Sequence, residues 1–167
     1  MTRQSLEAIE NFLAQKRIAI AGVSRNSESD SQKMFEALRT RGYDVVPVNP
    51  KAIQVQGQRC FSRVQDIQPP VHGVLVMTSA RVADKVVSDC AEAGVRRIWL
   101  YRGAAGQGSV SERALAICEN RGIEVVAGQC PFMFLPGASG VHRFHGLIRK
   151  MIGRYPKHCN GSSKLPA

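Results

Sequence analysis

Short apolar segments alternate along this chain with polar loops and with stretches of helical periodicity, and this alternation constrains the fold more than any other feature. The apolar segments are Ile18–Gly22, Asp44–Val48, Gly73–Met77, Arg97–Leu100 and Glu124–Val126. Apolar strands that alternate with helices are typical of a parallel sheet covered on both faces. The order therefore predicts an α/β fold, a Rossmann-like, doubly wound and mainly parallel five-stranded sheet with helices on both faces.

The intervening helices are predicted from apolar residues spaced three and four apart. They are expected at Ser5–Gln15, Ser31–Arg41, Ser79–Ala93 and Val110–Asn120. The stretch Ala52–Pro70 is irregular, with a short helix or turn at Ser62–Ile67, and Pro47 favours an edge position or a strand end for the second strand. Ligands of such sheets bind beyond the carboxyl ends of the strands, so the residues just after each strand are the candidates for a site.

Charge is unevenly distributed along the 167 residues, which carry 23 Lys and Arg against 13 Asp and Glu. No acidic residue follows Glu124, so the first 124 residues carry a net charge of +4 and the last 43 carry +6. A mildly basic sheet domain favours a phosphorylated small molecule over nucleic acid as its ligand. The hydrophobic fraction of 44% excludes a disordered chain.

Composition also bears on compartment and organisation. No apolar run approaches the roughly 18–20 residues of a membrane span, and the N-terminus lacks the apolar core of an export signal. Five cysteines without CxxC or zinc-finger spacing indicate a reduced, cytoplasmic protein. We expect the sheet domain at residues 1–136, a basic amphipathic helix at 137–157 and a disordered tail at 158–167.

The predicted C-terminal helix combines an apolar stripe with four basic residues over Val141–Tyr155. Such a helix packs back on the sheet domain or across a homodimer; the alternative is contact with an anionic membrane or nucleic acid, which no reader motif supports. His142 and His145 share one side of this helix, where they either ligate a metal together with a cysteine or are simply part of a basic helix. We expect no metal site.

The loop after the first strand has the composition of a phosphate-binding cradle. Gly22 permits a tight turn, and the next helix, beginning near Ser31, offers N–H groups at its N-terminus. Ser24 adds a neutral donor, and Arg25 and Lys33 add positive charge. The alternative is a simple turn with a solvated arginine. No GxGxxG motif is present, so the usual dinucleotide fingerprint is missing.

The loop after the second strand bears on the choice of cofactor. NAD sites usually have an acidic residue there for the ribose hydroxyls, whereas this chain has Asn49, Pro50 and Lys51. A lysine suits a phosphate near the ribose, as in NADP or in the 3′-phosphorylated ADP of coenzyme A; otherwise Lys51 is an ordinary surface lysine. No nucleophile–base pair and no Walker motif is present, so we expect no catalytic residues.

Four segments resemble the CoA-binding domain family, in the small stand-alone form that is similar to the CoA-binding domain of the succinyl-CoA synthetase α-subunit. They are IAIAGVSR (18–25), GYDVVPVNPK (42–51), IWLYRG (98–103) and VVAGQCP (125–131). The resemblance covers about two-thirds of the chain. The chain departs from the family at Met77–Ala80 and in the 36 residues after Pro131.

The resemblance implies a fold that binds coenzyme A or an acyl-CoA, as a non-catalytic sensor, carrier or regulatory module. An NADP-dependent oxidoreductase is the alternative, although no hydride-transfer motif favours it. By family likeness, the first loop lies along the pyrophosphate and pantetheine, and the second flanks the adenosine and its 3′-phosphate. The residues expected to bind the cofactor are Gly22, Val23, Ser24, Arg25, Ser31, Lys33, Asn49, Pro50, Lys51, Thr78, Ser79, Arg102, Gly103 and Cys130.

Cys130 follows the last strand, at the sheet edge where the ligand is expected. A CoA thiol bound nearby would be placed to form a mixed disulfide with this cysteine. The alternative is a small buried side chain, which is the role of most free cysteines.

Overall fold

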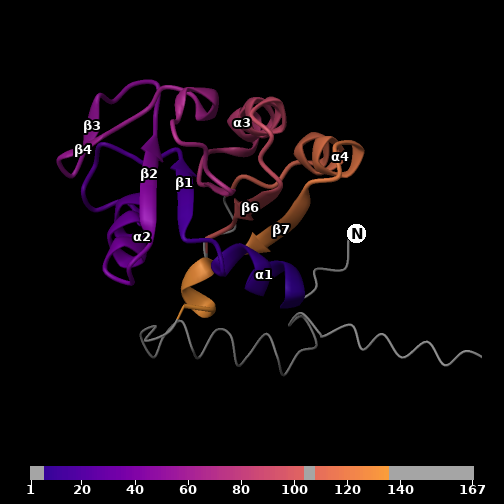
Figure 1. Ribbon diagram of the computed structural model, residues 1–167, viewed down its shortest axis with the longest axis horizontal. Helices are drawn as coiled ribbons and strands as arrows, with labels where there is room; N and C mark the ends of the chain where they lie inside the picture. The colour runs from indigo at the N-terminus through magenta and orange to yellow at the C-terminus, as the bar shows by residue number, and fades with distance from the viewer. Residues whose placement is uncertain (1–5, 104–107, 136–167) are drawn as a thin grey trace, which may run out of the picture.

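Five parallel strands form the central sheet in the part of the chain that the computed structural model describes, residues 6–103 and 108–135 (Figure 1). They are β1 (Arg17–Ala21), β2 (Asp44–Val48), β5 (Gly73–Val76), β6 (Arg97–Tyr101) and β7 (Glu124–Gln129). Their order is β2-β1-β5-β6-β7, and each pair of neighbours is parallel. The predicted Rossmann-like, doubly wound sheet is confirmed.

Helices cover both faces of this sheet, which makes a three-layer arrangement (Figure 1). One face carries α1 (Leu6–Leu13) and α2 (Asp30–Arg39), and the other carries α3 (Ala80–Glu92) and α4 (Glu112–Asn120). The order of strands reverses between β1 and β5, because the chain runs from β1 outward to β2 and then returns past β1 to β5.

The residues of β1 show how the sequence builds the two layers. Alternate side chains of a strand point to opposite faces of the sheet. Ile18 and Ile20 pack with the residues of α1 and α2, whereas Ala19 and Ala21 pack with those of α3 and α4. All four are at most 1% exposed. Burial on both faces explains why this strand is apolar at each of these four positions.

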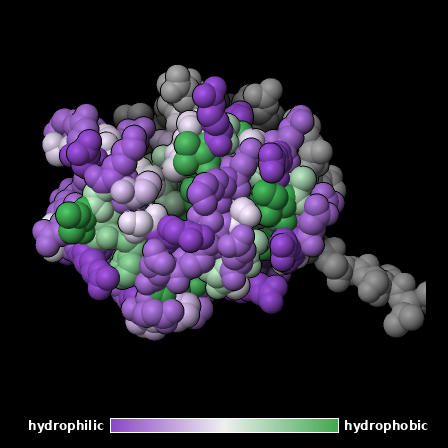
Figure 2. Space-filling model, turned by 90° about the horizontal axis from the view of Figure 1, so that it is seen from above, coloured by the Kyte–Doolittle hydropathy of each residue, from purple (hydrophilic) through white to green (hydrophobic). Residues whose placement is uncertain are grey.

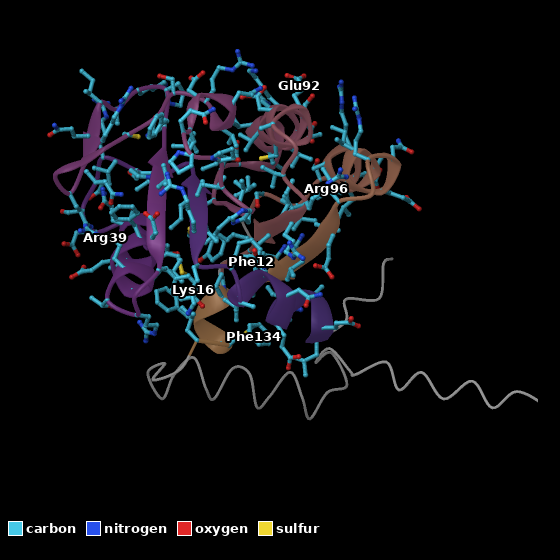
Figure 3. All side chains as sticks on the ribbon, in the orientation of Figure 1. Phe12, Lys16, Arg39, Glu92, Arg96 and Phe134 are labelled. Atoms are coloured by element: carbon cyan, nitrogen blue, oxygen red, sulfur yellow. The ribbon has the colours of Figure 1, made fainter. Side chains whose placement is uncertain are left out.

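Three aromatic rings join α1 to the last strands of the sheet, and two of them, Phe12 and Phe134, are labelled in Figure 3. Trp99 in β6 is fully buried, and its ring centroid lies 5.4 Å from that of Phe12 in α1. The ring of Phe134, which follows the 3-10 helix η2 (Pro131–Met133), lies 5.9 Å from Trp99. Trp99 Nε1 donates a hydrogen bond to the carbonyl of Gln129 at 2.9 Å. These contacts fix the end of β7 against the core.

The connection from β2 to β5 contains structure that the sequence predicted only in part. It forms a short hairpin, β3 (Gln54–Val55) and β4 (Gln58–Arg59), and then a 3-10 helix, η1 (Val64–Asp66). Asn49 N–H donates to the carbonyl of Phe61 at 2.9 Å, and Phe61 N–H donates to the carbonyl of Pro47 at 3.0 Å. This segment therefore lies along the outer side of β2, which is an edge strand of the main sheet, as Pro47 predicted.

The predicted basic helix at 137–157 and the tail at 158–167 lie outside the described residues, so their contacts stay predictions. The face shown in Figure 2 is mainly hydrophilic, with hydrophobic residues in small separate patches. Ile53 at 85% and Val82 at 47% are the exposed large hydrophobic residues of the described part. Within residues 6–103 and 108–135, no helix has the length and apolar character needed to cross a membrane.

Candidate functional site

Three loops follow the carboxyl ends of adjacent strands. Loop one (residues 22–29) follows β1, loop two (49–53) follows β2 and loop three (77–79) follows β5. β1 lies between β2 and β5, and the helices that follow β1 and β5 lie on opposite faces of the sheet. Ligands of doubly wound sheets bind at such a switch point. The predicted site residues of these loops therefore lie at the position where a ligand is expected.

Gly22 brings loop one and loop three into contact. Its φ is +94°, a backbone conformation that residues with a Cβ rarely adopt. A Cβ at this position would lie 2.7 Å from Thr78 Cγ2 and 3.0 Å from the carbonyl group of Met77. Gly22 N–H donates to the carbonyl of Val48 at 2.9 Å. Only glycine fits here, because both the turn and the close approach of loop three exclude a side chain.

Asn49 ties loop two to loop one. Its Nδ2 donates to the carbonyl of Val23 at 2.7 Å, and its Oδ1 accepts a hydrogen bond from Lys51 N–H at 2.8 Å. One side chain therefore holds the backbone of both loops. Asn49, which was predicted as a ligand contact, has a structural role that the sequence did not show.

Loop one ends in a capped helix. Ser29 is the N-cap of α2, and its Oγ accepts from Gln32 N–H at 3.3 Å. Ser31 is 6% exposed, and its Oγ accepts from Ser24 N–H at 2.9 Å. The N–H groups of Asp30 and Ser31, the first two residues of α2, have no partner within the helix, as at every helix N-terminus. They are donors of the type that bind phosphate.

The charges around loop one are mixed. Arg25 and Lys33 are exposed, as expected of groups that meet an anion, but Glu28 and Asp30 are exposed beside them. Tyr101, at the end of β6, donates from its hydroxyl to Asp30 Oδ2 at 3.1 Å. Burial first, and then the neighbouring Cys130 and Asp30, raise the pKa of the Tyr101 hydroxyl well above its ordinary value. The hydroxyl therefore stays protonated and keeps donating to Asp30.

Loop two presents a cation and an apolar side chain together. Pro50 and Lys51 are exposed, and Ile53, two residues after Lys51, is 85% exposed. A large aliphatic side chain this exposed is unusual in the described part, where most are buried. The sequence contained a signal for it, an isoleucine directly after Asn-Pro-Lys-Ala, which the prediction did not use.

The remaining predicted residues lie at the ends of β5, β6 and β7. Thr78 is partly buried against Gly22, and Ser79 is the exposed N-cap residue of α3. Arg102 is exposed and forms a bridge pair with Gly108. Gly103 lies beside the Tyr101 ring, since a Cβ there would be 2.9 Å from the tyrosine oxygen. Cys130 is partly exposed, whereas Cys60, Cys90 and Cys118 are buried.

Ser109 is a buried residue that the sequence did not single out. It is 0% exposed, and its Oγ lies 2.8 Å from the carbonyl of Val76 and 3.2 Å from that of Tyr101. The hydroxyl therefore holds together the ends of β5 and β6. A lone serine in a glycine-rich loop has no sequence pattern that reveals this contact.

A groove of about 450 Å³ lies elsewhere, beside α3 and α4. One of its acidic residues, Asp89, forms ion pairs there, at 3.2 Å from Lys85 Nζ and 3.4 Å from Arg63 Nη2. Burial alone would raise the pKa of Asp89, but hydrogen bonds from Gln65 and Lys85 and the two cations lower it overall. Among the described residues, no three His, Cys, Asp or Glu side chains are grouped to hold a metal ion.

The sequence matches known proteins over most of this unit. The family model described as "CoA binding domain" matches residues 16–136. The uncharacterized protein YneT of Bacillus subtilis is 28% identical over 115 residues, which are 69% of this chain and 82% of YneT. The ADP-forming acetate–CoA ligase II of Archaeoglobus fulgidus is 24% identical over 133 residues, which are 75% of this chain but only 19% of the ligase.

Solved structures agree with these matches. A hypothetical protein from Pyrococcus horikoshii OT3 is similar to this chain with a TM-score of 0.69 and 27% identity, over 78% of this chain and 87% of that one. A conserved hypothetical protein from Pyrococcus furiosus gives a TM-score of 0.62 and 26% identity, over 69% and 95%. Because the family model covers well over half of its residues, the chain belongs to the family of CoA binding domains.

Proposed function

We propose that this chain binds coenzyme A or an acyl-CoA across loops one, two and three, as a non-catalytic carrier, sensor or regulatory module. One observation carries the proposal: in a member of the CoA binding domain family, Gly22 against Thr78 and Asn49 against Val23 join three strand-end loops at the switch point of the sheet.

The chemistry of each loop indicates which part of coenzyme A it would contact. The N-terminus of α2, with Arg25 and Lys33 nearby, suits the diphosphate, because free N–H groups and cations both favour an anion. Lys51 suits the 3′-phosphate, and Ile53 offers an apolar surface for the adenine. The pantetheine arm would then run toward Tyr101 and Cys130.

We propose binding of the ligand and no reaction on it. The acetate–CoA ligase II of Archaeoglobus fulgidus and the α-subunit of the acetate–CoA ligase II of Pyrococcus furiosus are much longer chains, of which this chain covers 19% and 28%. Their ligase activity belongs to whole proteins that hold such a region among others. For this chain we therefore propose ligand binding and no ligase reaction.

Thermal-shift measurements with CoA, acetyl-CoA, NADP and NAD test the proposal, because a ligand that binds only the folded state raises the melting temperature. We expect a larger shift with CoA than with NADP. A larger shift with NADP, lost in Lys51→Ala, would replace the proposal with the oxidoreductase alternative, to which the relatives described above give no support.

Ile53→Ser tests the adenine surface without disturbing the core. Because the side chain is 85% exposed, we expect an unchanged melting temperature and a loss of CoA affinity of about fivefold, from the apolar area that the adenine covers. Val82→Ser, at the other exposed large hydrophobic residue, is the matched control and should leave affinity unchanged. Isothermal titration calorimetry measures both, and equal affinity of Ile53→Ser and wild type would remove Ile53 from the site.

Cys130 provides a covalent test of where the pantetheine arm ends. The Cys130 thiolate would attack one sulfur of oxidised CoA, forming a protein–CoA disulfide and releasing one CoA thiolate, which takes up the proton. Cys159 lies outside the described residues, so it is replaced by serine to leave Cys130 as the cysteine under test. In this Cys159→Ser background, we expect intact mass spectrometry to show one CoA adduct, lost on Cys130→Ser. No adduct, or an adduct that survives Cys130→Ser, contradicts this placement.

A further inference from the structure

The β3–β4 hairpin turns through a residue in an unfavourable backbone conformation. Gln56 has φ +47° and Gly57 has φ +75°, so both residues of this two-residue turn are left-handed, as in a type I′ turn. At the first central position of a type I′ turn, Gly, Asn and Asp are the preferred residues, whereas glutamine has no intrinsic preference for the left-handed conformation. The choice of glutamine therefore needs an explanation beyond the turn itself.

The side chain of Gln56 provides that explanation. Gln56 Nε2 donates to Oε1 of Gln32 at 2.7 Å, across 24 residues of sequence. Gln32 is 6% exposed, lies in the first turn of α2, and donates from its own Nε2 to the carbonyl of Ser24 at 2.5 Å. Two side-chain amides in series therefore link the hairpin tip to the backbone of loop one.

This link determines the orientation of one peptide group. The carbonyl of Ser24 points toward Gln32, and in a planar trans peptide the N–H of the next residue points the opposite way. The N–H of Ser24 is bound as well, to Ser31 Oγ at 2.9 Å. The N–H of Arg25 therefore points away from the Gln32 amide, and no described residue accepts a hydrogen bond from it.

We propose that Gln32 and Gln56 are positioning residues, which hold the Ser24–Arg25 peptide so that the Arg25 N–H is presented to a phosphate of the ligand. The proposal rests on the proposed function, because coenzyme A supplies that phosphate. It makes the β3–β4 hairpin part of the phosphate-binding apparatus, although the hairpin tip belongs to a different crossover of the sheet. Disturbing the hairpin tip then weakens ligand binding at loop one.

Gln56→Asn separates the two roles of this residue. Asparagine tolerates the left-handed conformation better than glutamine but is one methylene shorter, so it keeps the turn and cannot reach Gln32. We expect an unchanged or higher melting temperature of the free protein and a loss of CoA affinity of about tenfold by calorimetry. Gln54→Asn, at an exposed position of the same hairpin, should change neither. If Gln56 only stabilised the fold, any loss of CoA affinity in Gln56→Asn would be accompanied by a lower melting temperature.

Nuclear magnetic resonance of the ligand-free, 15N-labelled protein supplies an independent readout. Gln56→Asn should shift the backbone amide signal of Arg25 and speed solvent exchange of the Gln32 side-chain amide. Unchanged signals from both groups would show that the link from Gln56 through Gln32 does not hold loop one, whether or not CoA binds. Shifted signals with unchanged CoA affinity would overturn the positioning role and leave the proposed function standing. If the wild-type protein does not bind CoA, the proposed function is wrong, and Arg25 N–H then has no CoA phosphate to meet.

Discussion

Gly22→Ala is expected to destabilise the protein by about 2–4 kcal/mol and to weaken CoA binding more than tenfold. An alanine at φ +94° is strained, and its Cβ would lie 2.7 Å from Thr78 Cγ2 and 3.0 Å from the backbone of Met77. Loop one and loop three would have to separate. That movement would shift the N-terminus of α2 away from the position proposed for the diphosphate.

Gly94→Ala is the matched control for the backbone strain. Gly94 has φ +75°, but a Cβ there would meet nothing within 4 Å, and the residue follows α3, remote in sequence from the three loops. It should lower stability and leave CoA affinity unchanged. Thr78→Ser removes the methyl group nearest to the new Cβ, so adding it to Gly22→Ala should recover part of the lost stability. Wild-type CoA affinity in Gly22→Ala would contradict the contact between loops as the basis of the site.

Lys51→Glu is expected to reduce CoA affinity about a hundredfold, by replacing an attraction to the 3′-phosphate with a repulsion. Lys51→Ala should reduce it about tenfold. Neither variant should change the affinity for 3′-dephospho-CoA as strongly, because that ligand lacks the group that Lys51 is proposed to meet. Calorimetric titration of both ligands measures the difference, which should shrink at high salt.

Lys16→Glu is the control for the change in net charge. Lys16 is exposed and immediately precedes β1, at the opposite end of the strand from loop one. This variant should bind CoA and 3′-dephospho-CoA as the wild type does. An equal loss for both ligands in Lys51→Glu would assign Lys51 a general electrostatic role and remove it from the 3′-phosphate.

The sequence alone could place Gly22 and Lys51 at the carboxyl edge of the sheet, for a physical reason. Residues that directly follow apolar strands lie at the carboxyl edge of a parallel sheet, whatever the details of packing. The parallel sheet and its two helical layers followed from the same alternation, whereas the strand order β2-β1-β5-β6-β7 is seen only in the structure. The end of β7 was the least accurate boundary: pairing continues to Gln129 rather than ending at Val126, because Gly128, with φ +72°, lets the strand continue past an irregularity.

The contacts that shape the site were not accessible in this way. β3 and β4 are two residues each, too short for alternation to be seen in the sequence. Gln56 meets Gln32 across 24 residues, and Tyr101 meets Asp30 across 71, so both contacts depend on the completed fold. Which residues touch the ligand stays a prediction, including the assignments of Arg25 to the diphosphate and Lys51 to the 3′-phosphate.

The most direct test of the central claim is a crystal structure of this protein with coenzyme A. The account predicts the ligand at the carboxyl ends of β1, β2 and β5, with phosphate oxygens within hydrogen-bonding reach of the α2 N-terminus and of Arg25 or Lys51. A ligand bound elsewhere, or one with both of these side chains more than ~6 Å from every phosphate oxygen, too far for an ion-pair contact, would contradict it.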